Sequence, residues 1–180
     1  AYDHYGYGDT LLSQRVTLFQ DATLQSLSFY VTQAAGNLRL GIYDDLNDKP
    51  DSLVARADEF MPIEGWNTQN VQTPTLLPAG TYWLAYLPES DDLHFRVSPW
   101  TGTDSARYYS YSYGELPVTF STSAQSGEFQ SSFYGTFTVD VPPGTLYAGE
   151  VNLLNMNYGG LEDTVVGQVV EITETCTIQS

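Results

Sequence analysis

The side chains of this sequence that could do chemistry are few and scattered. Its two histidines, His4 and His94, lie far apart, and neither begins a metal-binding motif. No Gly-x-Ser-x-Gly elbow is present, and the single cysteine, Cys176, lies between threonines with no catalytic context. The 22 acidic residues offer so many carboxylate pairs that none is singled out for glycoside hydrolysis. The sequence therefore predicts a protein that is not an enzyme.

Calcium is the best motivated metal, because hard oxygen ligands gather beside a predicted hairpin turn. The candidate ligands are Asp44, Asp45, Asn47 and Asp48, with Asp51 close by. A second acidic group consists of Glu89, Asp91 and Asp92. The alternative interpretation of both groups is a solvated acidic turn, since no twelve-residue EF-hand loop is present.

Aromatic side chains suggest a carbohydrate site, because the apolar face of a sugar ring packs on a flat aromatic ring. The candidates for such a platform are Trp100, Tyr108, Tyr109, Tyr111 and Tyr113. The alternative is that Tyr109, Tyr111 and Tyr113 line one side of a strand and contribute to packing or to an interface. For Trp66 and Trp83 we expect a role in the core.

The elements that position these residues are predicted to be β-strands, because apolar and polar side chains alternate along much of the chain. Clear apolar series with this period are Leu27, Phe29, Val31; Leu38, Leu40, Ile42; Leu93, Phe95, Val97; and Phe129, Phe133, Phe137. Frequent turn signals, such as Ala35-Gly36-Asn37 and Ser126-Gly127, lie between these segments. The pattern predicts an all-β fold, an antiparallel β-sandwich or jelly roll. Only Ser52 to Phe60 hints at a helix, and a strand fits that segment equally.

A joint is predicted near Pro142-Pro143-Gly144, where the alternation is interrupted. We therefore expect a β-sandwich domain over residues 1–138 and a β-rich extension over residues 139–180. The last stretch of this extension, Val165 to Ile178, has high β-propensity and would be prone to aggregation if unpaired. Its candidate self-assembly residues are Val165, Val166, Val169, Val170, Ile172 and Ile178.

Three segments carry a resemblance to a known kind of module. They are Gly36 to Asp45, Gly65 to Thr68 and Leu77 to Tyr86, followed by a tyrosine-rich stretch from Tyr108 to Tyr113 and by Leu116 to Ser121. In this order and spacing, residues 2–138 resemble a β-sandwich domain of secreted bacterial proteins, which often stands beside polysaccharide-active or surface-anchored domains. The resemblance implies a jelly-roll-like fold similar to carbohydrate-binding modules, with no catalytic residues to carry over.

The charge balance limits the partners, since the net charge is −16. Nucleic acids and anionic membranes would be repelled, and no apolar run is long enough to span a bilayer. The first residue, Ala1, fits a mature exported chain from which a signal peptide was removed. We therefore expect an extracellular or cell-surface protein.

Two functions from different classes remain open on the sequence alone. The first is a structural subunit that assembles with copies of itself into a filament, tube or surface layer, because strand addition by the extension would link neighbouring chains. The alternative for the extension is that its strands fold back on their own sandwich. The second is a carbohydrate-binding module that attaches a secreted protein or a cell to polysaccharide.

Overall fold

Twelve β-strands form the regular structure of the computed structural model, which describes residues 2–99 and 105–139. They are β1 (Tyr2–His4), β2 (Thr10–Leu18), β3 (Ala22–Gln33), β4 (Leu38–Asp45), β5 (Pro50–Arg56), β6 (Gly65–Leu77), β7 (Gly80–Pro88), β8 (His94–Pro99), β9 (Ala106–Ser110), β10 (Gln125–Gly127), β11 (Phe129–Ser131) and β12 (Phe133–Thr138). No helix in this part of the chain could cross a membrane.

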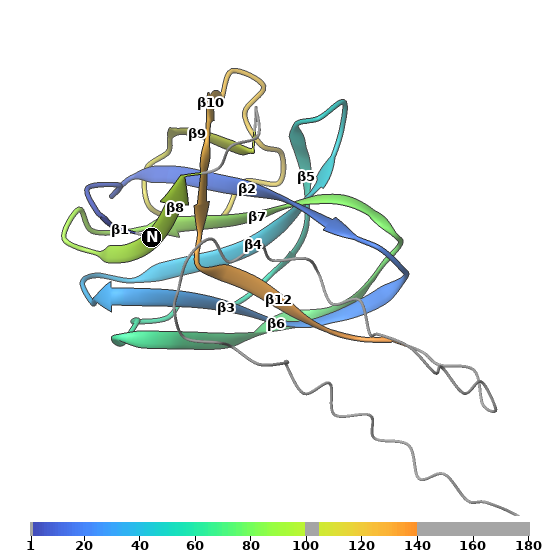
Figure 1. The fold of residues 1–180 in the computed structure, drawn as a ribbon, viewed down its shortest axis with the longest axis horizontal. Helices are drawn as coiled ribbons and strands as arrows, with labels where there is room; N and C mark the ends of the chain where they lie inside the picture. Colours follow the sequence, from blue (N-terminus) through green and yellow to red (C-terminus); the bar gives the residue numbers. More distant parts are fainter. Residues whose placement is uncertain (1, 100–104, 140–180) are drawn as a thin grey trace, which may run out of the picture.

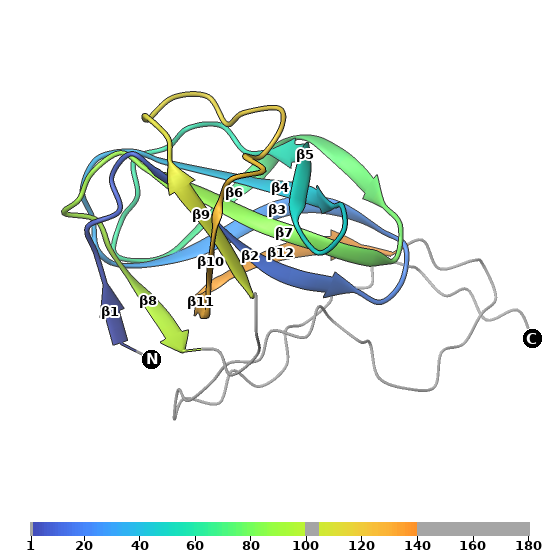
Figure 2. The same ribbon diagram turned by 90° about the horizontal axis from the view of Figure 1, so that it is seen from above.

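The strands form two antiparallel sheets that pack face to face (Figures 1 and 2). In the first sheet, sheet A, β3 is central and pairs with β6, β8 and β12, while β1 and β11 pair with β8. The second sheet, sheet B, has the order β10-β9-β2-β7-β4-β5. The predicted all-β sandwich is therefore confirmed. The segment Ser52 to Phe60 begins within strand β5 and contains no helix.

The main core lies between the sheets and is built from the predicted alternation. Leu27, Phe29 and Val31 of β3 are fully buried, and they meet Leu40 and Ile42 of β4 across the interface. Since successive side chains of a strand point to opposite faces, the residues between them on β3 must lie on the outer side of sheet A. This alternation decides which side chains sheet A presents outward.

A second, smaller core covers the outer side of sheet B. Trp83 of β7 and Leu11 of β2 are buried there against Leu116 and Phe120, which come from the segment between β9 and β10. The Tyr43 hydroxyl fastens this segment by donating a hydrogen bond of 2.8 Å to the Pro117 carbonyl. This segment thus covers the part of the outer side of sheet B around Leu11 and Trp83.

Gln14 of β2 ties the two sheets together inside the sandwich. Its side chain is 2% exposed, its Oε1 accepts a hydrogen bond of 2.7 Å from the Ser131 amide, and its Nε2 donates one of 3.4 Å to the Phe133 carbonyl. These backbone groups lie where β11 passes into β12. Gln14 therefore satisfies two polar groups that would otherwise be buried without a partner.

Most of the expected turns lie between strands. Gly36, in the connection from β3 to β4, has a φ of 63°, and Asn47 and Asp48, in the β4–β5 hairpin, have φ values of 56° and 62°. The turn signal at Ser126-Gly127 is wrong, because both residues belong to β10 and pair with β9. The predicted extension, including its joint at Pro142-Pro143-Gly144, lies beyond the described residues.

Candidate functional site: the outer face of sheet A

The outer side of sheet A carries aromatic and small polar side chains in a regular array. On β3 these are Ser26, Ser28 and Tyr30, which alternate with the buried core residues. Their register partners on β6 and β12 point to the same side, because paired residues of an antiparallel sheet share a face. The array, called the aromatic face below, consists of Ser26, Ser28, Tyr30, Trp66, Thr68, Asn70, Tyr134 and Thr136.

Three rings form the centre of this face. The Trp66 indole lies 5.3 Å from the Tyr30 ring and 4.9 Å from the Tyr134 ring, centroid to centroid. Its plane makes angles of 73° and 62° with those two rings, so the three rings form a stepped surface rather than a flat one. Trp66 is 39% exposed and both tyrosines are half-buried. The rings therefore hold one another in place, while part of their apolar surface remains exposed.

Polar groups continue the face below the rings. Ser28 lies opposite both Thr68 and Tyr134 in the register, and its hydroxyl is 2.8 Å from that of Thr68. In the next row, Ser26 lies between Asn70 and Thr136, both of which are exposed. Hydroxyl and amide groups both donate and accept hydrogen bonds. Ser26 and Ser28 are themselves buried, so the exposed polar side chains of the aromatic face are those of Thr68, Asn70 and Thr136, which lie beside the rings without a charged group.

The prediction of a core role for Trp66 is wrong, whereas Trp83 is fully buried as expected. Trp66 lies opposite Tyr30 in the β3–β6 register, and Tyr30 points away from the core. The sequence did contain a usable signal, because Tyr30 and Tyr134 each adjoin a buried phenylalanine on the opposite side of the strand. The missing information was the register that brings Trp66 between them.

The predicted tyrosine platform lies elsewhere in the molecule and is largely engaged in packing. Tyr108 packs with Phe129 against the main core, whereas Tyr109 contacts Phe120 edge to face at 5.0 Å in the core outside sheet B. Tyr111 and Tyr113 follow the end of β9 and belong to the covering segment. Trp100, the fifth platform candidate, lies outside the described residues.

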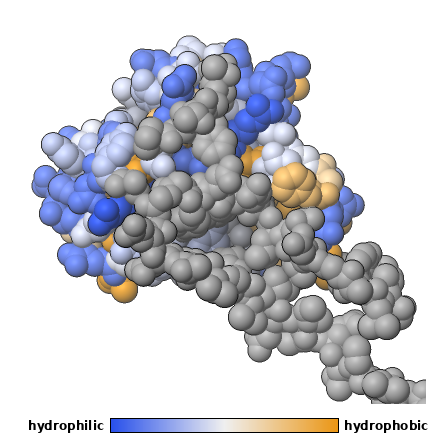
Figure 3. Space-filling view, viewed as in Figure 1, coloured by the Kyte–Doolittle hydropathy of each residue, from blue (hydrophilic) through white to orange (hydrophobic). Residues whose placement is uncertain are grey.

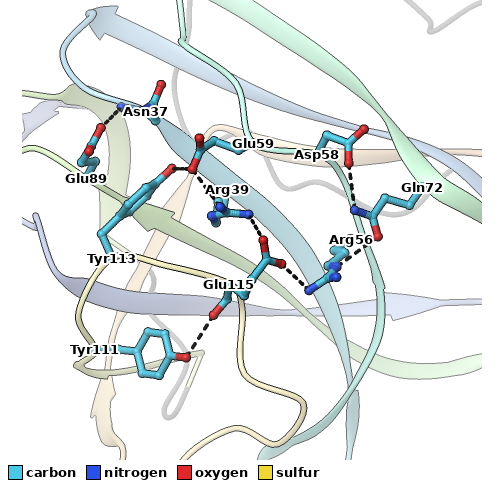
Figure 4. Close-up of polar contacts among 10 residues, drawn as sticks. All are labelled: Asn37, Arg39, Arg56, Asp58, Glu59, Gln72, Glu89, Tyr111, Tyr113 and Glu115. Atoms are coloured by element: carbon cyan, nitrogen blue, oxygen red, sulfur yellow. Dashed lines mark hydrogen bonds and ion pairs between the residues drawn. The ribbon is translucent and has the colours of Figure 1, made fainter.

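Tyr113 is part of a polar network that secures the covering segment (Figure 4). Its hydroxyl donates a hydrogen bond of 2.9 Å to Glu59, and the Arg39 guanidinium lies 5.6 Å from its ring centre. Arg39 also binds Glu59 at 2.8 Å and Glu115 at 2.9 Å. Burial, reinforced by the nearby Glu59 carboxylate, raises the pKa of Tyr113. The network joins β4 to the segments after β5 and β9 and has the character of a structural clamp.

The candidate calcium ligands direct their oxygens toward groups of the protein itself. Asp44 accepts a hydrogen bond of 2.6 Å from the Ser52 amide, and Asp45 accepts one of 2.8 Å from the Trp83 indole. Asp48 forms an ion pair of 2.6 Å with Arg15, and neighbouring Asn47 is exposed at the turn. Within residues 2–99 and 105–139, no three His, Cys, Asp or Glu side chains are arranged to hold a metal ion. Calcium binding stays a prediction.

The second acidic group likewise caps backbone amides. Glu89 accepts a hydrogen bond of 2.8 Å from the Asn37 amide, and Asp91 accepts one of 2.8 Å from the Gly8 amide. The predicted self-assembly residues, Val165, Val166, Val169, Val170, Ile172 and Ile178, fall outside the described part of the chain, as does Cys176.

The described residues define a β-sandwich in which one sheet carries an uncharged, partly exposed group of aromatic and polar side chains on its outer side. Comparisons with models of known protein families, with curated proteins and with solved structures find no match to this chain. The resemblance of residues 2–138 to a carbohydrate-binding-module-like domain therefore stays a prediction.

Proposed function

We propose that this chain is a non-catalytic, extracellular carbohydrate-binding domain that holds a neutral polysaccharide on its aromatic face. The observation that carries the proposal is the group of Trp66, Tyr30 and Tyr134 beside exposed hydroxyl and amide side chains. A sugar presents both an apolar ring face and many hydroxyl groups. The aromatic face offers the complement of each within one patch.

The charge of the protein favours a neutral glycan over an acidic one. With a net charge of −16, the chain repels polyanions at long range. The visible side of the molecule is mostly hydrophilic where it is not grey, with separate hydrophobic patches (Figure 3). None of the eight residues of the aromatic face is charged, so its ligand need not supply a compensating charge.

The stepped arrangement of the rings further limits the ligand. Because the Trp66 plane is steeply inclined to both tyrosines, the three rings cannot lie together on a flat crystalline surface. They suit a single glycan chain whose successive sugar rings change orientation. A soluble polysaccharide is therefore the expected ligand class.

Replacing Trp66 by alanine tests the proposal. Affinity electrophoresis in gels containing mixed-linkage β-glucan, xyloglucan, arabinoxylan or galactomannan should show retardation of the wild-type chain by at least one of them. We expect Trp66→Ala to weaken that binding by about thirtyfold, the effect of losing an interface side chain worth about 2 kcal/mol. The loss follows from removing the central and most exposed of the three rings.

Leu76→Ala is the matched control, because Leu76 is a 63% exposed apolar residue on the same strand, well away from the rings. It should migrate like the wild type in every gel. Equal retardation of Trp66→Ala and wild type would refute the aromatic face as the binding site. Free migration of the wild type in all four gels would refute the proposed function.

Self-assembly through residues 139–180 is the second candidate function. Among the described residues of sheet A, β6 pairs with β3 and forms one isolated bridge, between Val71 and Ala57. Pro74 of β6 lacks an amide hydrogen, and the register with β3 shifts beside Leu24. Both features discourage pairing along the other side of β6. A polymer could form by direct pairing of two β6 strands or by donation of a strand from the extension. These features favour donation by the extension.

Deleting residues 139–180 separates the two functions, because β12 ends at Thr138 and the aromatic face lies before it. If the extension links chains, electron microscopy should show regular polymers of the full chain and none of the shortened one. Retention on polysaccharide should be the same for both. Polymers formed by the shortened chain would contradict strand donation.

A further inference from the structure

A second exposed aromatic pair lies on the outer side of sheet A, at its other edge. In the β1–β8 register Asp3 is opposite Arg96 and His4 is opposite Phe95, so the next residue, Tyr5, comes opposite His94. The two rings stack with centroids 4.9 Å apart and planes 22° apart. Tyr5 is 63% exposed, so the ring face turned away from His94 is open to solvent.

This pair faces the same way as the three central rings. Phe95 and Val97 of β8 are buried in the core, which places His94 and Arg96 on the outer side of the strand. On β3, the fully buried Val31 pairs with Phe95, and Tyr30 adjoins it on the outer side. The Tyr5–His94 pair and the Tyr30–Trp66 pair are therefore two aromatic groups on one surface.

Polar groups occupy the space between the two aromatic groups. The Tyr30 amide donates to the Ser132 carbonyl and the Ser132 amide donates to the Arg96 carbonyl, both at 3.0 Å, so Ser132 lies between β3 and β8. The Arg96 guanidinium is 3.4 Å from the Asp3 carboxylate, the longest of the five ion pairs among the described residues, and both side chains are partly exposed. From β6 to β1, the outer side of sheet A thus presents aromatic rings, then polar groups, and then the Tyr5 ring.

The separation of the aromatic groups sets a minimum length for a ligand that touches both. Where β3 and β8 pair directly, at Val31 and Phe95, three strand spacings separate β6 from β1, and the two groups are offset by about three residues along the strands. With strands about 4.8 Å apart and about 3.3 Å per residue, the distance is roughly 15–20 Å. A single sugar cannot span that distance, whereas an oligosaccharide of several residues can.

We infer that the ligand is an extended glycan chain that crosses the strands from Trp66 to Tyr5, with the Tyr5 ring as a second stacking site and Arg96 and Asp3 as hydrogen-bonding groups between them. This inference rests on the proposed function and adds to it the direction and length of the bound chain. Only a ligand long enough to extend from Trp66 to Tyr5 can contact both aromatic groups. Affinity should therefore rise with chain length until the chain spans both groups.

The test is isothermal titration with a disaccharide and a hexasaccharide prepared from the neutral polysaccharide that retards the wild-type chain most. We expect Tyr5→Ala to weaken hexasaccharide binding about tenfold, as the loss of one stacking contact of about 1.4 kcal/mol would. Binding of the disaccharide to Tyr5→Ala should equal that of the wild type. Trp66→Ala should weaken binding of both ligands.

Tyr2→Ala is the matched control, since Tyr2 is a 48% exposed tyrosine of β1 that faces the other side of the sheet, opposite Val97. It should leave the binding of both ligands unchanged. Unchanged hexasaccharide binding in Tyr5→Ala, or an equal loss for both ligands, would overturn the inference while leaving the proposed function intact. Absence of any wild-type binding would overturn both.

Discussion

Replacing Trp83 by alanine should lower the free energy of unfolding by about 3–5 kcal/mol, the usual effect of removing a large buried aromatic side chain. Trp83 is fully buried, its indole donates a hydrogen bond of 2.8 Å to Asp45, and the Arg107 guanidinium lies 5.6 Å from its ring centre. Domains of this kind are stable by only about 5–15 kcal/mol, so the variant should lose a large part of its stability.

Urea denaturation followed by circular dichroism measures this effect. Trp83→Phe should be less damaging than Trp83→Ala, because a ring still fills most of the space while the hydrogen bond to Asp45 is lost. Trp66→Ala serves as the comparison, since it removes the same side chain from a partly exposed position and should cost much less stability. A loss below about 1 kcal/mol in Trp83→Ala would contradict a tightly packed core outside sheet B.

Replacing Gln14 by leucine should lower the free energy of unfolding by about 2–6 kcal/mol, although leucine has a similar size and is more hydrophobic. The Ser131 amide and the Phe133 carbonyl would lose their side-chain partner inside the sandwich. An unsatisfied buried polar group costs about 1–3 kcal/mol, and the change leaves two of them. Few other single substitutions of a polar residue should have so large an effect here.

Gln33→Leu is the control for this change. Gln33 is exposed, and its amide also donates to a backbone carbonyl, that of Asp92, at 3.0 Å. Its replacement should change stability by less than about 0.5 kcal/mol, because water can replace the lost partner. Since Gln14 anchors the start of β12, which carries Tyr134, Gln14→Leu should also weaken polysaccharide binding. Equal stability of the two variants in urea would refute the role assigned to Gln14.

The fold could be predicted from the sequence because the alternation of apolar and polar side chains is visible within each strand segment. Buried and outward residues alternate along β3 and β8, and each series of apolar side chains could be assigned to one side of a strand without knowing its neighbours. Ser126-Gly127 misled because a serine–glycine pair is typical of turns, whereas pairing with β9 holds this segment extended. Where local preference and tertiary pairing disagreed, the pairing decided the outcome.

The candidate site depends on information that is not local. The ring of Trp66 lies between those of Tyr30 and Tyr134, although the three residues come from distant parts of the sequence. Only the registers of β6 and β12 against β3 bring them together. By contrast, Tyr108 to Tyr113 attracted attention as a cluster in the sequence, yet most of these rings are used to cover sheet B. Local density of aromatic residues therefore did not indicate which rings from distant segments lie together, and the tyrosine platform stays a prediction.

The strand connectivity described above also determines when the domain can fold. Each of the first three strands pairs with a strand far along the chain: β1 with β8, β2 with β9 and β3 with β12. Closing such long loops is slow, and proteins dominated by distant pairings fold in milliseconds to seconds. A chain emerging from a ribosome or a secretion pore cannot complete sheet A until Thr138 has appeared. Folding must therefore follow synthesis or export of nearly the whole domain rather than accompany it.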